Sequence, residues 1–175
     1  MAAPNLRRVT TGYDENQDRM RITGESDDGE PVVIWMTNRL ARRAIPPIVH
    51  WLDKDVPPSG TPPSGTPPSG KENVMQSFAQ EAAVAGLNRQ KPVAVSADTK
   101  EWLAQSIEIA VTGHYLTLKF KAPPDQSASI RFGATQLRQW LSILHRSWMK
   151  AEWSPLVWPD WIKGEEATSQ ERAIH

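Results

Sequence analysis

The stretch from Ser106 to Trp153 changes its hydrophobic period part-way along, and this change constrains the fold more than any other sequence feature. Apolar and polar residues alternate in SIEIAVTG, HYLTLKFK and SASIRF, as in strands with one face on a core. In ATQLRQWLSILHRSWMKAEW the apolar residues instead form one helical stripe, which consists of Leu137, Trp140, Leu141, Leu144 and Trp148. The pattern predicts three strands followed by a core-facing helix, with Arg138, Gln139 and Arg146 on its exposed face.

The first part of the chain has the same order of elements. LRRVTT, RMRIT and PVVIWM are strand candidates, and the loops between them are rich in Gly, Asn and Asp, which favour turns. TNRLARRA follows as a predicted helix, with the Thr37 hydroxyl at its N-cap. Pro46 and Pro47 lack an N–H and restrict the residue before them, so we expect a break or kink after Ala44.

The two halves, about residues 5–53 and 92–151, look like two versions of one unit. At an offset of 97 residues Leu40 corresponds to Leu137 and Trp51 to Trp148, while RMRI and YLTL are one residue off that register. The alternative is that strand and helix patterns resemble one another by chance.

The segment between the halves contains three copies of a five-residue unit, VPPSGTPPSGTPPSG. This composition predicts a flexible linker over about 55–72. KENVMQSFAQEAAVAGL predicts a helix over 72–86 with Val74, Phe78, Ala82 and Ala85 on its apolar side. KPVAV is a candidate short strand, and Asp98 with Glu101 resembles a capping box that opens a helical turn through Trp102. Residues 164–175 are polar and are expected to form a disordered tail.

These elements predict one α+β domain over residues 1–163. It contains two three-stranded antiparallel β-meanders, arranged as a β-sandwich or a curved sheet, and each meander is followed by a helix. A helical insertion separates the two halves.

Composition excludes several classes of protein. The 20 Lys and Arg residues balance 20 Asp and Glu residues, so no global charge favours a polyanionic partner. The absence of Cys excludes disulfides, thiolate metal sites and a cysteine nucleophile. No run of 18 apolar residues occurs and the N-terminus has no apolar signal region, so we expect a cytoplasmic protein with no membrane partner.

No motif supports catalysis. Residues 65–71, GTPPSGK, match a phosphate-binding loop in spacing, but Pro67 and Pro68 have no N–H and Glu72 replaces the magnesium-binding hydroxyl. His50 with Asp53 and Asp55 has metal-ligand chemistry without a rigid frame. We therefore expect no cofactor, no metal, no catalytic residue and no enzymatic activity, and a small enzyme with an unrecognised site is the remote alternative.

Two groups of residues are candidate interaction sites. Trp153, Trp158 and Trp161 lie in a Trp- and Pro-rich segment and either plug the open end of the sandwich or anchor a protein partner. The second group is basic and is a candidate nucleic-acid interface, since Arg and Lys on helix faces contact phosphates; it consists of Arg39, Arg42, Arg43, Arg138 and Arg146.

The segments EPVVIWMTNRLARRA, IEIAVTGHYLTLKF and SIRFGATQLRQWL follow an order of elements that resembles one known superfamily. It is the head domain shared by the end-joining ligase scaffold protein of DNA repair and the centriolar cartwheel protein. The resemblance covers about residues 5–151 and implies a β-sandwich head and a structural role. The family's dimerising coiled coil has no counterpart, because Pro155 and Pro159 follow Trp153 in place of heptads.

We therefore expect a non-catalytic scaffold or protein–protein interaction protein that self-associates, with a protein partner or a homodimer as its assembly. A nucleic-acid-binding module is the alternative.

Overall fold

The computed structural model describes residues 3–55 and 68–164. The predicted linker, apart from its ends, and the predicted tail beyond Gly164 lie outside the described residues.

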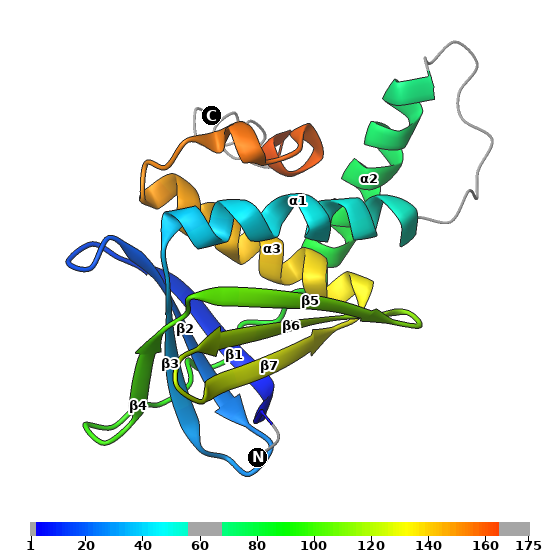
Figure 1. Cartoon of the computed structure of the whole chain (residues 1–175). Coiled ribbons are helices and arrows are strands. Elements are labelled where there is room, and N and C mark those ends of the chain that lie inside the picture. The colour runs from blue at the N-terminus through cyan, green and yellow to red at the C-terminus, as the bar shows by residue number, and fades with distance from the viewer. Residues whose placement is uncertain (1–2, 56–67, 165–175) are drawn as a thin grey trace.

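Both predicted meanders are present and the fold class is α+β, as predicted. β1 (Asn5–Asp14), β2 (Arg19–Ser26) and β3 (Pro31–Met36) form the first meander, and β5 (Ser106–Thr112), β6 (Tyr115–Ala122) and β7 (Gln126–Phe132) form the second. Together with β4 (Lys100–Leu103) they make one seven-stranded sheet in the order β4-β3-β2-β1-β7-β6-β5. The two meanders are thus parts of a single curved sheet (Figure 1).

The segment between the inserted helix and the second meander differs from the prediction. Trp102 lies in β4, which pairs in parallel with β3, and not in a helical turn. The hydrogen bonds that β3 offers at its edge outweigh the local capping signal. KPVAV forms no strand; its Val93 is buried and donates its N–H to Thr10 Oγ1 at 2.9 Å.

Two helices, α1 (Asn38–Asp55) and α3 (Ala134–Lys150), cover the open side of the sheet (Figure 1). The predicted stripe of α3 is confirmed as core, because all five of its residues are buried. A third helix, α2 (Pro68–Ala85), packs against α3, and the short 3-10 helix η1 (Pro155–Val157) contacts α1.

The predicted break in α1 is wrong. Pro46 and Pro47 lie inside a continuous helix on its exposed side. The carbonyls that lose their helical partner belong to Arg42 and Arg43, which are exposed as well, so water can satisfy them. The opposite side of the helix is buried and holds it in place; it carries Ala41, Ala44, Ile45, Ile48 and Leu52.

The predicted helix over 72–86 is confirmed, but its predicted apolar side is the exposed one. Val74 and Phe78 are 44% and 64% exposed, whereas Gln76 and Gln80 are buried. The two amides donate hydrogen bonds to main-chain oxygens of α1 and α3, from Gln76 to Leu52 at 3.2 Å and from Gln80 to Arg138 at 3.0 Å. Hydrophobic periodicity could not identify a helix that docks through amide side chains.

The structural elements of the two halves correspond at an offset of 96 residues. The sequence comparison of the two helices had predicted an offset of 97 residues. β2 and β6 begin and end 96 residues apart, and α1 and α3 begin 96 residues apart. Their buried residues also correspond at this offset, for example Ile34 with Ile130 and Leu52 with Trp148. The repeated arrangement is therefore a property of the fold, while a duplication as its origin stays a prediction.

The same repeat explains how the sheet is joined. β1 pairs in parallel with β7 through Leu6 and Ile130, and β4 pairs in parallel with β3 through Trp102 and Ile34. These two pairs are equivalent at the offset of 96 residues. β4 and β5 together therefore occupy the place that β1 alone occupies in the first half.

Gly24 offers a test of core packing at this junction. A Cβ at Gly24 would lie 2.5 Å from Leu6 Cδ1, and Leu6 is itself only 2% exposed. We expect Gly24→Ala to lower the free energy of unfolding by about 1–3 kcal/mol because the core is overpacked. The matched control is Gly12→Ala, where nothing lies within 4 Å of the new Cβ. Urea denaturation measures both, and equal effects would contradict this account.

Candidate functional site

Trp153, Trp158 and Trp161 are buried, at 8%, 2% and 4% exposure. Trp153 and Trp158 each meet Trp148 edge to face, with centroids 5.1 and 5.4 Å apart. The chain after α3 thus folds back over the helices, in keeping with the alternative in which these indoles plug the end of the sandwich. Their rings are not available on this surface as anchors for a partner.

Arg138 is not on an exposed face, as the sequence predicted, but only 4% exposed. Its guanidinium donates to Gln76 Oε1 and lies 5.1 Å from the centroid of the Trp161 ring. Burial lowers the pKa of Arg138, and the nearby carboxylates of Asp55 and Asp53 partly offset this effect. The prediction failed because α2 covers this side of α3, and a contact between inserted and terminal helices leaves no periodic signal in the sequence.

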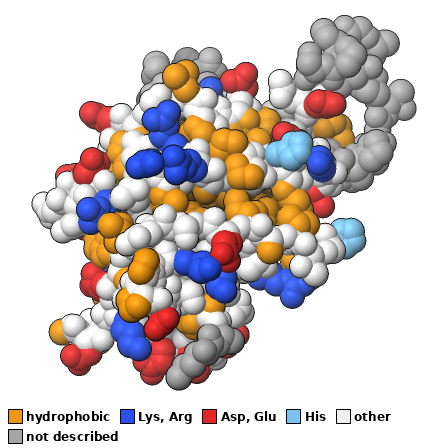
Figure 2. Space-filling model, viewed as in Figure 1, with side chains coloured by type: hydrophobic (Ala, Val, Ile, Leu, Met, Phe, Trp, Pro, Cys, Tyr) orange, Lys and Arg blue, Asp and Glu red, His pale blue; other side chains and the backbone are white. Residues whose placement is uncertain are grey.

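The other basic candidates are divided between two places. Arg39, Arg42 and Arg43 are exposed on α1, and Figure 2 shows Lys and Arg side chains gathered over this helix. Arg146 is exposed on α3, where it lines a groove. The structure therefore does not bring all five predicted arginines together on one exposed surface, because Arg138 is buried.

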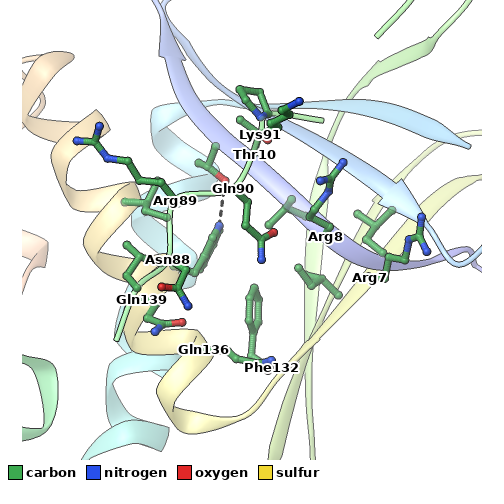
Figure 3. Close-up of a pocket in the computed structure, with 18 of the residues that line it drawn as sticks. Arg7, Arg8, Thr10, Asn88, Arg89, Gln90, Lys91, Phe132, Gln136 and Gln139 are labelled. Atoms are coloured by element: carbon green, nitrogen blue, oxygen red, sulfur yellow. Dashed lines mark hydrogen bonds between the residues drawn. The ribbon is translucent and has the colours of Figure 1, made fainter. Parts of the chain in front are cut away.

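The groove lies between β1 and α3 and is crossed by the segment Gly86–Pro92; we call it the β1/α3 groove (Figure 3). It has a volume of about 520 Å³, and no Asp or Glu is among the residues that line it. Six cationic side chains do line it, namely Arg7, Arg8, Arg89, Lys91, Arg131 and Arg146. A chain of zero net charge thus concentrates positive charge in one concave site.

Polar amides and aromatic rings complete the groove. Figure 3 shows Asn88, Gln90 and Gln139 around the space beside Phe132, with Gln136 at its lower end. Phe132 stacks on Trp140 with centroids 5.4 Å apart, and Trp140 Nε1 donates to Thr11 Oγ1 at 3.0 Å. Sequence reasoning missed this site, although the clusters LRR and NRQK were its signal.

The other half of the molecule has an apolar surface at the equivalent place, since β5 and α1 correspond to β1 and α3. We call it the α1/β5 face and define it by residues of both elements: Pro46, Pro47, Val49, Ile107, Ile109 and Val111. Val111 is 54% exposed, Pro46 and Pro47 are exposed, and the other three are half-buried. Figure 2 shows hydrophobic side chains between the basic residues of α1 and the strand below it. At the offset of 96 residues Trp140 and Ile143 of the groove correspond to Ala44 and Pro47.

β5 also forms an edge of the sheet. Among the described strands it pairs with β6 alone, through a hairpin whose loop is Gly113 and His114. Gly113 has a φ of +58°, which suits the first position of a two-residue hairpin turn. In such a hairpin alternate residues bond to the partner strand, so the N–H and C=O groups of Ile107, Ile109 and Val111 point to the open edge.

No group of three or more His, Asp or Glu side chains that could hold a metal occurs within residues 3–55 and 68–164. Part of the GTPPSGK motif lies outside the described residues. His145 is buried at 1% exposure and packs edge to face on Trp158, with centroids 5.0 Å apart.

The environment of His145 predicts a loss of stability in acid. Burial, aided by the charge of Lys163, lowers the pKa of His145 from 6.5 to about 4. As the pH decreases, His145 binds a proton near pH 6.5 in the unfolded chain but only near pH 4 in the folded chain. The free energy of unfolding therefore decreases as the pH falls from 6.5 to 4 and is constant below that. We expect a loss of about 2 kcal/mol from pH 7 to pH 5 by urea denaturation. His145→Phe should remove most of this loss, and replacement of the exposed His114 by Ala should not; equal pH profiles for wild type and His145→Phe would contradict the assignment.

Comparisons with family models, with curated proteins and with solved structures find no match. The resemblance to the scaffold head domain therefore stays an expectation. Within the described part of the chain, no helix is both long enough and apolar enough to cross a membrane.

Proposed function

We propose that the protein is a non-catalytic interaction protein that self-associates through the α1/β5 face. The observation that carries this proposal is a long edge strand, with Glu108 as its one charged residue, within an exposed apolar surface. Proteins usually guard such edges with Lys, Pro, bulges or very short strands. β4, at the other edge, has four residues and begins with Lys100. β5 has seven residues and contains neither Lys nor Pro.

A second copy of the chain suits this edge. Antiparallel pairing of two β5 strands about Ile109 would place each Ile109 beside its counterpart and each Ile107 beside Val111. On the other side of the strand Glu108 would face Ala110, so like charges do not meet. Glu108 is meanwhile bound by Lys121 of its own chain at 2.8 Å. The pairing would extend the row of buried residues in β6, which includes Leu116, Leu118 and Phe120.

This proposal moves the predicted partner surface from the Trp- and Pro-rich segment after α3 to the edge of the sheet. Burial of Trp158 and Trp161 supports a structural role for that segment. The absence of enzymatic activity and a cytoplasmic location stay predictions.

The test is the concentration dependence of solution mass, measured by sedimentation equilibrium or light scattering. We expect the wild-type chain to form a dimer. Val111→Lys should weaken it at least about ten-fold, or ~1.4 kcal/mol, because an ammonium replaces an apolar contact. Ile109→Lys, closer to the proposed two-fold axis, should weaken it at least as much.

Val95→Lys is the matched control, since Val95 is 44% exposed and lies outside the α1/β5 face. Phe78→Lys tests the other exposed apolar surface, on α2. A wild-type chain that stays monomeric, or a dimer that Phe78→Lys disrupts and Val111→Lys does not, would overturn the proposal. Thermal melting of each variant confirms that the fold is retained.

A further inference from the structure

The charge and shape of the second site point to a separate activity: we infer that the β1/α3 groove binds a single strand of nucleic acid. The inference does not depend on self-association, because the groove and the α1/β5 face share no residue.

Three of the six cations in the groove are free to meet phosphates. Arg89, Lys91 and Arg146 form no ion pair with any carboxylate in the part of the chain that the structure describes. Arg7 and Arg8 both bind Glu25, which lies outside the lining. Arg131 lies 3.9 Å from the centroid of the Tyr115 ring. The unpaired charge is thus concentrated in the crossing segment and on α3, where a chain of phosphates can run between them.

The start of α3 adds to the positive potential. Its first turn contains no acidic residue, and Gln136 from that turn lines the groove. A phosphate near this end would meet the positive end of the helix dipole as well as Arg131. The first turn of α3 and the crossing segment therefore provide two places for phosphates, and amides of both elements lie around the space beside Phe132 (Figure 3).

The amides indicate nucleic acid in preference to a simple polyanion. Asn and Gln side chains each carry a donor and an acceptor and can match the edge of a base. Asn88, Gln90, Gln136 and Gln139 all line the groove. Gln136 Oε1 accepts from the Gly133 N–H and Gln139 Nε2 donates to the Ala83 carbonyl, so the amides of Asn88 and Gln90 are the ones with both ends open to a base. A sulfated or purely acidic ligand could accept hydrogen bonds from the amide N–H groups but would offer no donor to the amide oxygens.

The shape of the groove favours a single strand. Its volume of about 520 Å³ is in the range of sites for small organic molecules, which is about 300–1,000 Å³. The segment Gly86–Pro92 forms one wall, and an unpaired base can enter a recess of this size and present its whole edge to the amides. One or two nucleotides can occupy the groove while the rest of the strand follows the cations.

Fluorescence anisotropy with labelled oligonucleotides tests the inference on the full chain. Mixed-sequence single strands of RNA and of DNA are titrated separately, so that a preference for either kind of nucleic acid can be measured. We expect binding that weakens with salt, with a slope of about −2 in log K against log salt for three phosphate contacts. Arg89→Glu with Arg146→Glu should weaken binding at least about ten-fold, because two contacts become repulsive.

Arg42→Glu with Arg43→Glu is the matched control, because it makes the same change of charge on exposed residues of α1. This pair should alter the affinity less than about two-fold if binding is confined to the groove. An equal loss in both double variants, or no binding of either strand at low salt, would overturn the assignment. Equal affinity for a duplex of the same sequence would overturn its single-stranded character. Circular dichroism of both double variants checks that the fold is retained.

Discussion

The fold depends on the burial of one apolar stripe on each of two helices at the open side of a single sheet. Ile45, Ile48 and Leu52 of α1 and Leu141, Leu144 and Trp148 of α3 are almost completely buried and belong to one hydrophobic cluster with the core-facing residues of both meanders. Burial of each such side chain contributes roughly 1.5–3 kcal/mol. This stripe is strong enough to keep α1 helical through Pro46 and Pro47, which lie on its opposite side. The sheet need not close into a barrel because the two helices occupy the place where further strand pairing would otherwise be required.

The repeat makes the β1/α3 groove and the α1/β5 face equivalent in position, but their side chains are chemically different. In the second half β4 takes over the pairing with β3, so β5 is left with one partner and a free edge beside α1. In the first half β1 remains continuous, and Gly86–Pro92 crosses between it and α3. Trp140 in the groove corresponds to the smaller Ala44 on α1. One place is thus cationic and concave and the other is apolar and exposed. The two equivalent places therefore differ in charge and shape although the strands and helices that form them correspond.

Local periodicity was sufficient to predict both meanders, the helix stripe of α3 and the α+β class, because each pattern reflects burial on one side of one element. It failed wherever a contact joined distant segments. Arg138 was expected at the surface since nothing nearby in the sequence shows that Gln76 and Gln80 of α2 pack over it. Trp102 was placed in a helical turn because its partner Ile34 lies in another half of the chain. The β1/α3 groove combines residues of β1, the crossing segment, β7 and α3, so only the topology could bring its cations together.

The inserted helix α2 packs on the outside of the core through polar contacts. No described side chain of α2 belongs to the cluster. Its contact with α3 includes hydrogen bonds from Gln80 to the Arg138 carbonyl and from Gln139 to the Ala83 carbonyl, at 3.0 and 2.9 Å. Each such bond contributes only about 0.5–1.5 kcal/mol net, yet leaving the Arg138 guanidinium buried without Gln76 would cost considerably more. The polar contact of α2 with α3 therefore adds little to the free energy of unfolding, but it fixes how the two helices are aligned. Because α2 leads directly into Gly86–Pro92, the same polar contacts position the crossing segment that forms one wall of the groove.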